Sequence, residues 1–286
     1  MRRNFAQVLK AAKINPENEY RKLYDMLYGP SIQMPTGNRI SAYDELRDHF
    51  IGFYFRGTCL SIEEFNDKHG FHFQKSPDPF VLDELISLCE YIWNMLMGYQ
   101  SAVGAQGYGY GIMANTSINI QFYLMQISTL IENMGYERLE QDGFTIFTEK
   151  SPVAIAVAES SLIPQGLSYK LVSYNHHSMK GNLQEKKNTI LQLADLLEPK
   201  RKELNRIDST LSGDLFYLFN NLNLRHNNID SALKEKYKQV VAEMEQEQLE
   251  TWYDETYQMC LLAFMSLEQA DRKIKFDELK HKIEAK

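Results

Sequence analysis

Apolar side chains recur at three- and four-residue spacing near the end of this chain. The recurring positions are Leu249, Trp252, Tyr253, Thr256, Met259, Cys260, Ala263, Phe264 and Leu267. Residues three or four apart share one face of an α-helix, so the pattern predicts a long helix with a wide apolar stripe. A second run, from Val81 to Met97, is apolar around most of its circumference and predicts a buried helix that Pro79 opens.

Short polar residues indicate where helices begin, because their side chains can accept hydrogen bonds from the unpaired amides of a first turn. The candidate N-cap residues are Asn15, Ser61, Ser151, Asn182 and Ser212. Helices are also expected over residues 41–50, about 116–134, 168–177 and 215–222. Val153, Ile155 and Val157 alternate with alanines, a pattern that would suit a strand as well as a helix.

One stretch has the pattern of a β-hairpin. Residues 136–148 form two short runs around Asp142-Gly143, a pair typical of two-residue hairpin turns. Residues 31–38 are expected to form a loop, and residues 51–57 either a strand or an aromatic loop. The predicted fold class is therefore mainly α, a multi-helix bundle with one small inserted β-hairpin. Residues 1–134 would form an N-terminal helical layer and 135–286 a C-terminal bundle that starts with the hairpin, unless the two form one continuous domain.

Composition excludes several classes of protein. The net charge of −7 and the pI of about 5.6 give no basic field for DNA, although five basic residues gather at Lys186, Lys187, Lys200, Arg201 and Lys202. The three cysteines are far apart, which argues against a disulfide framework and a zinc ribbon. No apolar run approaches the length of a membrane span, and the first residues lack the apolar core of a signal peptide. We expect a cytoplasmic protein without a membrane partner.

Sequence motifs of common cofactor and metal sites are missing. Four glycines, Gly104, Gly107, Gly109 and Gly111, lack the Lys-Ser/Thr of a phosphate-binding loop and are expected to connect two helices; a small-molecule site there is a distant alternative. His69 and His72 have no third ligand at suitable spacing. Serine-nucleophile, zinc-protease and EF-hand motifs do not occur. We therefore predict no cofactor and no metal.

The densest group of polar side chains follows an apolar run that starts at Phe216. It contains Arg225, His226, Asn220, Asn223, Asn227 and Asn228. Arginine offers a planar fork for phosphate or carboxylate, and histidine can move protons near neutral pH. Asparagines also cap helices and form turns, so the same residues could simply end one helix and start another. A second candidate is Asn175-His176-His177, whereas Glu243, Glu245, Glu247 and Glu250 are interpreted as a solvated helix face.

Residues 220–228 and 249–263 together resemble the end of HEPN-type helical domains of bacterial abortive-infection and defence proteins. The resemblance implies a dimer in which an Arg/His/Asn element lies between the last helices. Members that cut RNA carry an arginine, four to six residues, and then a histidine. Here His226 follows Arg225 directly, so the residues correspond by type and not by spacing.

Two functions follow as expectations. In the first, the chain is a HEPN-like protein of a defence or stress system, a homodimer with RNA or a nucleotide as candidate ligand. Arg225 and His226 would be the catalytic residues of metal-independent RNA cleavage, and Asn220, Asn223, Asn227 and Asn228 would contact the ligand or an interface. In the second, the chain is a non-catalytic regulatory or scaffold protein whose Arg/His/Asn block forms a dimer or partner interface.

Overall fold

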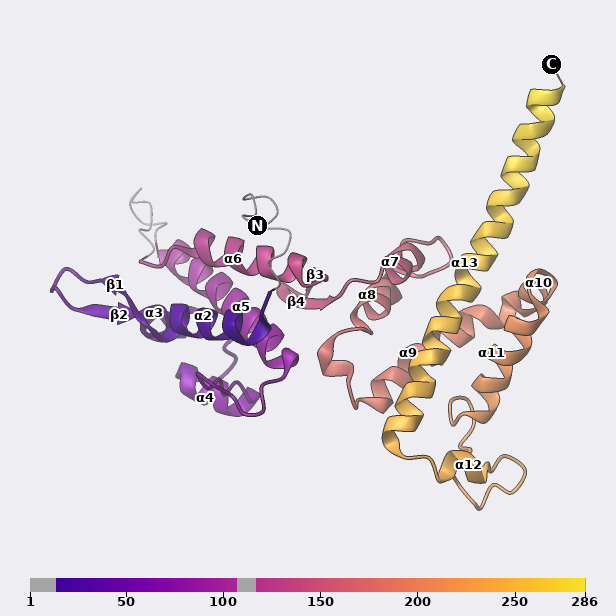
Figure 1. Cartoon of the computed structure of the whole chain (residues 1–286), viewed down its shortest axis with the longest axis horizontal. Helices are drawn as coiled ribbons and strands as arrows, with labels where there is room; N and C mark the ends of the chain where they lie inside the picture. Colours follow the sequence, from indigo (N-terminus) through magenta and orange to yellow (C-terminus); the bar gives the residue numbers. More distant parts are fainter. Residues whose placement is uncertain (1–13, 107–116, 286) are drawn as a thin grey trace, which may run out of the picture. The chain divides into compact units, whose positions relative to one another are not determined.

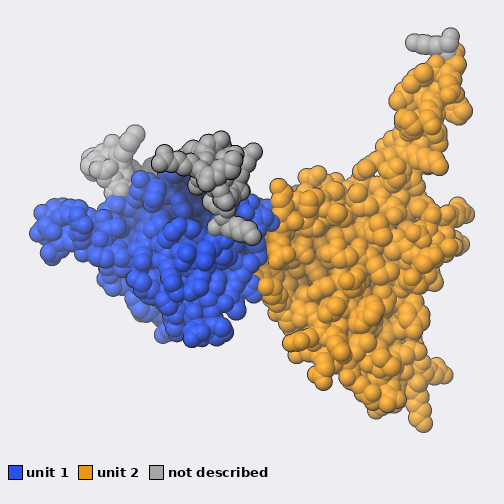
Figure 2. All heavy atoms as spheres, in the orientation of Figure 1, with its two compact units in different colours: residues 1–147 blue, residues 148–286 orange. Residues whose placement is uncertain are grey.

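The computed structural model describes residues 14–106 and 117–285, so most of the glycine-rich segment at 104–111 lies outside the described residues (Figure 1). The described chain is mainly α-helical, with two antiparallel sheets of two strands each, which confirms the predicted fold class. It divides into two compact units, Met1–Phe147 (unit 1) and Thr148–Lys286 (unit 2), shown in Figure 2. The division falls inside the second strand of the predicted hairpin, so most of that hairpin belongs to unit 1.

Unit 1 is built around the long helix α5. Its elements are α2 (Pro16–Tyr28), β1 (Pro30–Gln33), β2 (Arg39–Ser41), α3 (Ala42–His49), the 3-10 turn η1 (Phe50–Gly52), α4 (Ile62–His69), α5 (Leu82–Gln106), α6 (Ile120–Asn133), β3 (Tyr136–Gln141) and β4 (Phe144–Glu149). Helices α2, α3 and α6 all pack on α5. Helix α5 begins three residues after Pro79, later than the sequence predicted.

Most of the predicted helix starts in unit 1 are confirmed. The side chain of Asn15 accepts a hydrogen bond from the Asn18 amide, and that of Ser61 accepts one from the Glu64 amide. Helix α3 begins with a complete capping box, in which Ser41 and Asp44 each accept a hydrogen bond from the other's backbone amide.

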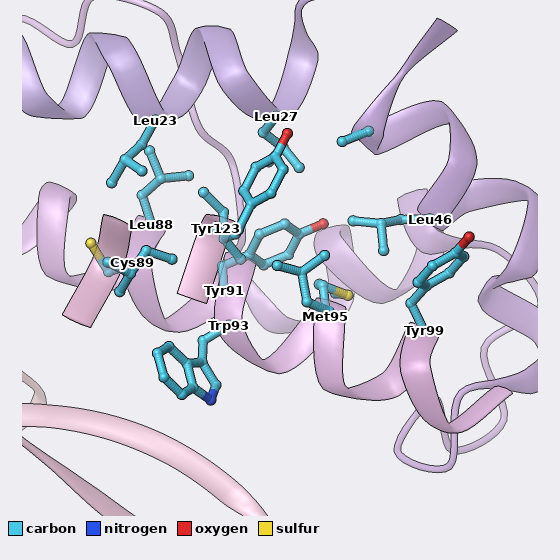
Figure 3. Close-up of a cluster of buried hydrophobic side chains, with 14 of the residues drawn as sticks. Leu23, Leu27, Leu46, Leu88, Cys89, Tyr91, Trp93, Met95, Tyr99 and Tyr123 are labelled. Atoms are coloured by element: carbon cyan, nitrogen blue, oxygen red, sulfur yellow. The ribbon is translucent and has the colours of Figure 1, made fainter. Parts of the chain in front are cut away.

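The core of unit 1 is rich in tyrosine, as Figure 3 shows. Buried hydroxyls need partners, and they have them: Tyr91 donates to Asn66 at 3.1 Å and Tyr99 donates to Glu45 at 2.7 Å. Desolvation raises the pKa of both phenols far above the ordinary value. The tyrosines of this core are therefore structural donors.

The structure has one more hairpin than the sequence predicted. The turn at Asp142-Gly143 is confirmed, with φ of 53° and 83°, the left-handed geometry of such turns. Residues 31–38, predicted as a loop, instead contribute to an antiparallel pair in which β1 contacts β2. These strands are too short for an alternating pattern to appear. Residues 51–57 form η1 and irregular turns and no strand.

Unit 2 contains α7 (Pro152–Ala158), α8 (Gln165–Ser173), the 3-10 turns η3 (His177–Met179) and η4 (Glu198–Lys200), α9 (Leu183–Leu197), α10 (Arg201–Ile207), α11 (Ser209–Asn221), α12 (Gln239–Ala242) and α13 (Gln246–Glu284). The predicted caps Ser151 and Asn182 begin α7 and α9, so 153–157 is helical. The prediction for Ser212 is wrong, because Asp208 caps α11 and accepts a hydrogen bond from the Leu211 amide, leaving Ser212 buried at the end of the first turn.

Helix α13 organises unit 2, packing against α7, α9, α10 and α11. Its first part supplies the predicted apolar stripe to the core, including Tyr257, Leu261 and Phe264. Beyond Leu267 it has no buried residue among those described. We call residues 268–284 the α13 tail; Figure 1 shows it extending past the other helices of unit 2.

Candidate functional site

The polar block after α11 forms an ordered loop at residues 222–238, which we call the asparagine loop. The amide groups of Asn220 and Asn221 donate back to carbonyls of their own helix, at Phe216 and Tyr217. The chain then turns through Asn223, whose φ of 53° lies in the left-handed region that asparagine tolerates better than most residues. These residues end the helix, as the capping interpretation predicted.

Asn228 holds the asparagine loop together. Its side chain is almost completely buried, with 1% of the residue exposed. The Oδ1 atom accepts from the Asn223 amide at 2.8 Å, and Nδ2 donates to the carbonyls of Asn220 and Lys236 at 3.2 and 2.7 Å. Its carbonyl also accepts from the Lys238 amide at 2.8 Å. One amide therefore ties the end of α11 to both ends of the loop.

Arg225 fastens this loop to α9. Its guanidinium forms an ion pair with Glu198 and donates to the Ala194 carbonyl at 3.1 Å. The same group lies 5.2 Å from the ring centroid of Phe219, within range of a cation–π contact. A guanidinium held by a carboxylate, a carbonyl and a ring is already neutralised and positioned. The Nη1 atom of Arg225 would have to release Glu198 before it could bind a phosphate.

His226 has a different neighbour. Lys236 Nζ lies 3.0 Å from its Nε2 atom and 3.2 Å from Nδ1. Among the described residues, no hydrogen bond or ion pair joins the side chains of Arg225 and His226. The structure thus places the two predicted catalytic residues side by side in the chain but gives them separate partners. Asn227 is exposed, unlike its neighbour Asn228.

An apolar groove lies beside the asparagine loop. We call it the Trp252 groove, and its cavity of about 510 Å³ is lined by Tyr217, Leu218, Asn221, Leu222, Tyr237, Lys238, Gln239, Val240, Val241, Met244 and Trp252. Tyr217, Val240 and Trp252 expose between 46% and 71% of their surface. The hydrogen bonds of Asn228 to Lys236 and Lys238 hold the segment that forms one wall. Asn228 therefore supports the groove by holding the backbone of residues 236–238 in place.

A second hollow of about 420 Å³ shares Val240, Met244 and Trp252 with the groove and continues along the first turns of α13. Its other lining residues are polar: Glu243, Gln248 and Thr251. Glu243, Glu245 and Glu247 are all exposed here, as the sequence predicted for a solvated face, and give this edge a negative charge. Trp252 was predicted to belong to the apolar core stripe, but it is 46% exposed and lies at the edge of that stripe, next to the buried Tyr253.

Lys186 forms the other polar cluster of unit 2. Only 6% of its side chain is exposed, so Lys186 does not contribute to a basic surface with the basic residues near it in the sequence. Its Nζ atom lies 2.7 Å from carboxylate oxygens of both Glu250 and Asp254. Glu250 is also bound by the Gly181 amide at 2.8 Å, which corrects its assignment to a solvated face. Two carboxylates that could ligate a metal here are thus already paired with an ammonium.

Aromatic side chains complete the Lys186 cluster. Tyr174 donates to Asp254 at 2.9 Å and stacks on Tyr257 with ring centroids 3.9 Å apart. Burial, and then the negative charge of Asp254, raise the pKa of Tyr174 well above its ordinary value. Burial alone would raise the pKa of Glu250, but hydrogen bonds from Lys186 and Gly181 and the lysine charge hold it below the ordinary value. The cluster joins α8, α9 and α13 and is satisfied internally.

The second sequence candidate, His176, lies beside this cluster. Its Nδ1 atom contacts the Ser178 hydroxyl at 2.7 Å and the Ser178 amide at 3.2 Å, where it caps η3. With Tyr174, Lys186 and Asp254 it lines a cleft of about 210 Å³, small for a ligand site. We therefore take the Trp252 groove as the candidate functional site.

Comparison with known proteins adds no relative: the chain matches no family model, no curated protein and no solved structure. Within the described residues, no helix has both the length and the apolar character needed to cross a membrane.

Proposed function

We propose that this chain is a non-catalytic binding protein whose Trp252 groove takes up a basic amphipathic helix. The observation that supports this most is the exposure of Tyr217, Val240 and Trp252 around one cavity. Exposed aromatic residues that line a concave apolar surface are typical of protein-binding sites. An amphipathic helix fits such a groove through apolar residues at three- and four-residue spacing.

The charge of the groove favours a basic ligand. Glu243 lines the extension of the cavity, and Glu245 and Glu247 are exposed next to it; Lys238 is the one basic residue of the lining. Lysines beside the apolar face of a bound helix would pair with these carboxylates. In this proposal the asparagine loop supports the groove. The second function expected from the sequence was also non-catalytic, but there the Arg/His/Asn block itself formed the interface.

The proposal is tested with a synthetic amphipathic helix made of leucine and lysine. Trp252 is one of two tryptophans, and the other, Trp93, is buried, so a Trp93→Phe variant isolates the fluorescence of the groove. Binding is expected to shift the emission of Trp252 to the blue, and Tyr217→Asp is expected to weaken binding at least tenfold. The matched control is Leu60→Asp, an exposed leucine of unit 1. Equal binding by both variants would contradict the proposal.

RNA cleavage is the second candidate, supported by the resemblance to HEPN domains and by one contact. Lys236 brings an ammonium within 3.0 Å of the His226 ring, so two basic side chains adjoin on the asparagine loop. A phosphodiester would bind there through these groups, with Arg225 freed from Glu198. The test is hydrolysis of a panel of RNAs in EDTA. Loss of activity in both Arg225→Lys and His226→Ala supports this candidate, and unchanged activity in both rejects the site.

A further inference from the structure

The α13 tail has the chemistry that the Trp252 groove requires. Phe276, Leu279 and Ile283 expose between 51% and 65% of their surface. Their spacing of three and four residues places them on one face of the helix. Basic residues accompany this face: Arg272, Lys273, Lys275, Lys280 and Lys282. The tail also carries five acidic residues, so its excess of basic residues is confined to positions 272–284, and its apolar face has no partner among the described residues.

The same copy cannot place its tail in its own groove. Trp252 and Phe276 lie on one continuous helix, 24 residues apart, or about 36 Å at 1.5 Å per residue. A straight helix cannot fold back on itself. Only a second chain can bring a tail to the groove.

We infer that the groove of one copy binds the α13 tail of a second copy, so that two α13 helices pair antiparallel. This inference rests on the proposed function and names the ligand of its groove. Because the pairing is symmetric, each copy provides one groove and one tail, and the contact closes as a dimer.

Two series of positions with seven-residue spacing run along one face of α13, and five of their eleven residues are apolar. The two series are Gln248, Glu255, Leu262, Gln269, Phe276 and Ile283, and Thr251, Gln258, Met265, Arg272 and Leu279. Met265 is partly buried against the core of unit 2. Leu262, at the middle of this face, is itself 54% exposed. If Leu262 of one copy lies against Met265 of the other, antiparallel pairing places Phe276 opposite Thr251, beside Trp252. Leu279 then lies opposite Gln248, which lines the extension of the groove.

The charges agree with this register. The same pairing places Arg272 opposite Glu255 and Lys282 beside Glu247. Residues 243–255 contain six acidic residues and no lysine or arginine, and four of the six remain for a second copy because Glu250 and Asp254 are paired with Lys186. Residues 272–284 contain five basic and three acidic ones. The helix dipole also favours acidic first turns and basic last turns, but its effect is confined to the end turns and does not account for charges at Glu255 and Arg272.

Sedimentation equilibrium of the full chain tests the inference. The wild type is expected to be a dimer, and Leu279→Asp and Trp252→Asp are each expected to weaken dimerisation at least tenfold. Leu279 belongs to the exposed tail, so its change leaves the fold intact, which circular dichroism checks. Leu60→Asp, in unit 1, is the matched control and should leave the dimer unchanged. A wild type that stays monomeric at its highest soluble concentration, or a dimer insensitive to Leu279→Asp, overturns the inference.

Charge exchange tests the register. Arg272→Glu with Lys282→Glu should weaken the dimer, and adding Glu255→Arg with Glu247→Lys to the same chain should restore it. Failure to restore overturns the antiparallel register.

A separate measurement distinguishes the inference from the proposed function. In the Leu279→Asp variant the groove is vacant, so the leucine–lysine helix should bind this variant more tightly than the wild type. If the helix binds both proteins equally and the wild type is a monomer, the groove function holds and the inference fails. If the helix binds neither protein and the wild type is a monomer, both fail.

Discussion

The two parts of α13 have similar apolar spacing but opposite surroundings. From Tyr253 to Leu267 the apolar face is covered by α7, α9, α10 and α11, and Tyr257 and Leu261 have no exposed surface. From Glu268 onward the helix continues, yet Phe276, Leu279 and Ile283 are exposed. Apolar periodicity therefore identifies the helix face that packs against other residues. The rest of the chain determines whether those residues belong to the same copy.

The largest difference between the two parts should appear in folding stability. Phe264→Ala removes a ring that is 1% exposed and should lower the free energy of unfolding of unit 2 by about 3–5 kcal/mol. Phe276→Ala, in the tail, should change this free energy by less than about 0.5 kcal/mol at concentrations where the chain is monomeric. Urea unfolding followed by circular dichroism measures both. Comparable losses would mean that the tail packs within its own unit.

Lys186 stabilises the buried part through charge. Lys186→Met leaves Glu250 and Asp254 without their shared ammonium, and breaking such a pair should cost about 3 kcal/mol. Asp254 is nearly half exposed, which keeps the cost at the lower end of the range for buried pairs. The same urea titration measures it. A gain in stability would show that desolvation of the lysine outweighs both ion pairs.

Asn228 connects stability to the groove. Asn228→Ala removes hydrogen bonds to Asn223, Asn220 and Lys236 and should cost about 2 kcal/mol, because the buried backbone groups lose their partners. Since the Lys236 carbonyl then loses the Asn228 side chain, while the bond from the Lys238 amide to the Asn228 carbonyl remains, binding of the leucine–lysine helix should also weaken. Asn227→Ala, at the exposed neighbouring position, is the control and should change neither quantity.

Glu250 makes the stability of the buried part depend on pH. Its pKa in the folded protein is held below the ordinary value, so the carboxylate contributes stability above the pKa of the unfolded chain, and this contribution is lost as the pH falls through the folded pKa. The difference in unfolding free energy between wild type and Glu250→Gln should therefore shrink as the solution is acidified from neutral pH. A constant difference would rule out ionisation as its source.

Local signals predicted much of this fold, because they depend on neighbours in the chain. Asn15, Ser61, Ser151 and Asn182 cap helices as expected, and Asp142-Gly143 forms the predicted turn. Ser212 was misassigned because Asp208, four residues earlier, competes for the same role.

Features that depend on distant residues could not be predicted. Arg225 is held by Glu198, 27 positions away, and Lys186 by Glu250 and Asp254, more than 60 positions away. Each looked like a free basic residue in the sequence. The density of asparagines was visible in the sequence, but the burial of Asn228 and its contacts with the segment that lines the groove depend on the packing of α11, α12 and α13.

The central claim, that the Trp252 groove binds the α13 tail of a second copy, is tested most directly by a disulfide. In the chain carrying Gln248→Cys and Leu279→Cys, the two thiols lie about 46 Å apart along one helix and cannot join within a copy. The native cysteines are all buried. Mild oxidation should produce a covalent dimer from this chain, whereas Gln248→Cys combined with Glu278→Cys, one residue off the paired face, should give little. Equal yields from the two chains, or no covalent dimer from either, would contradict the claim.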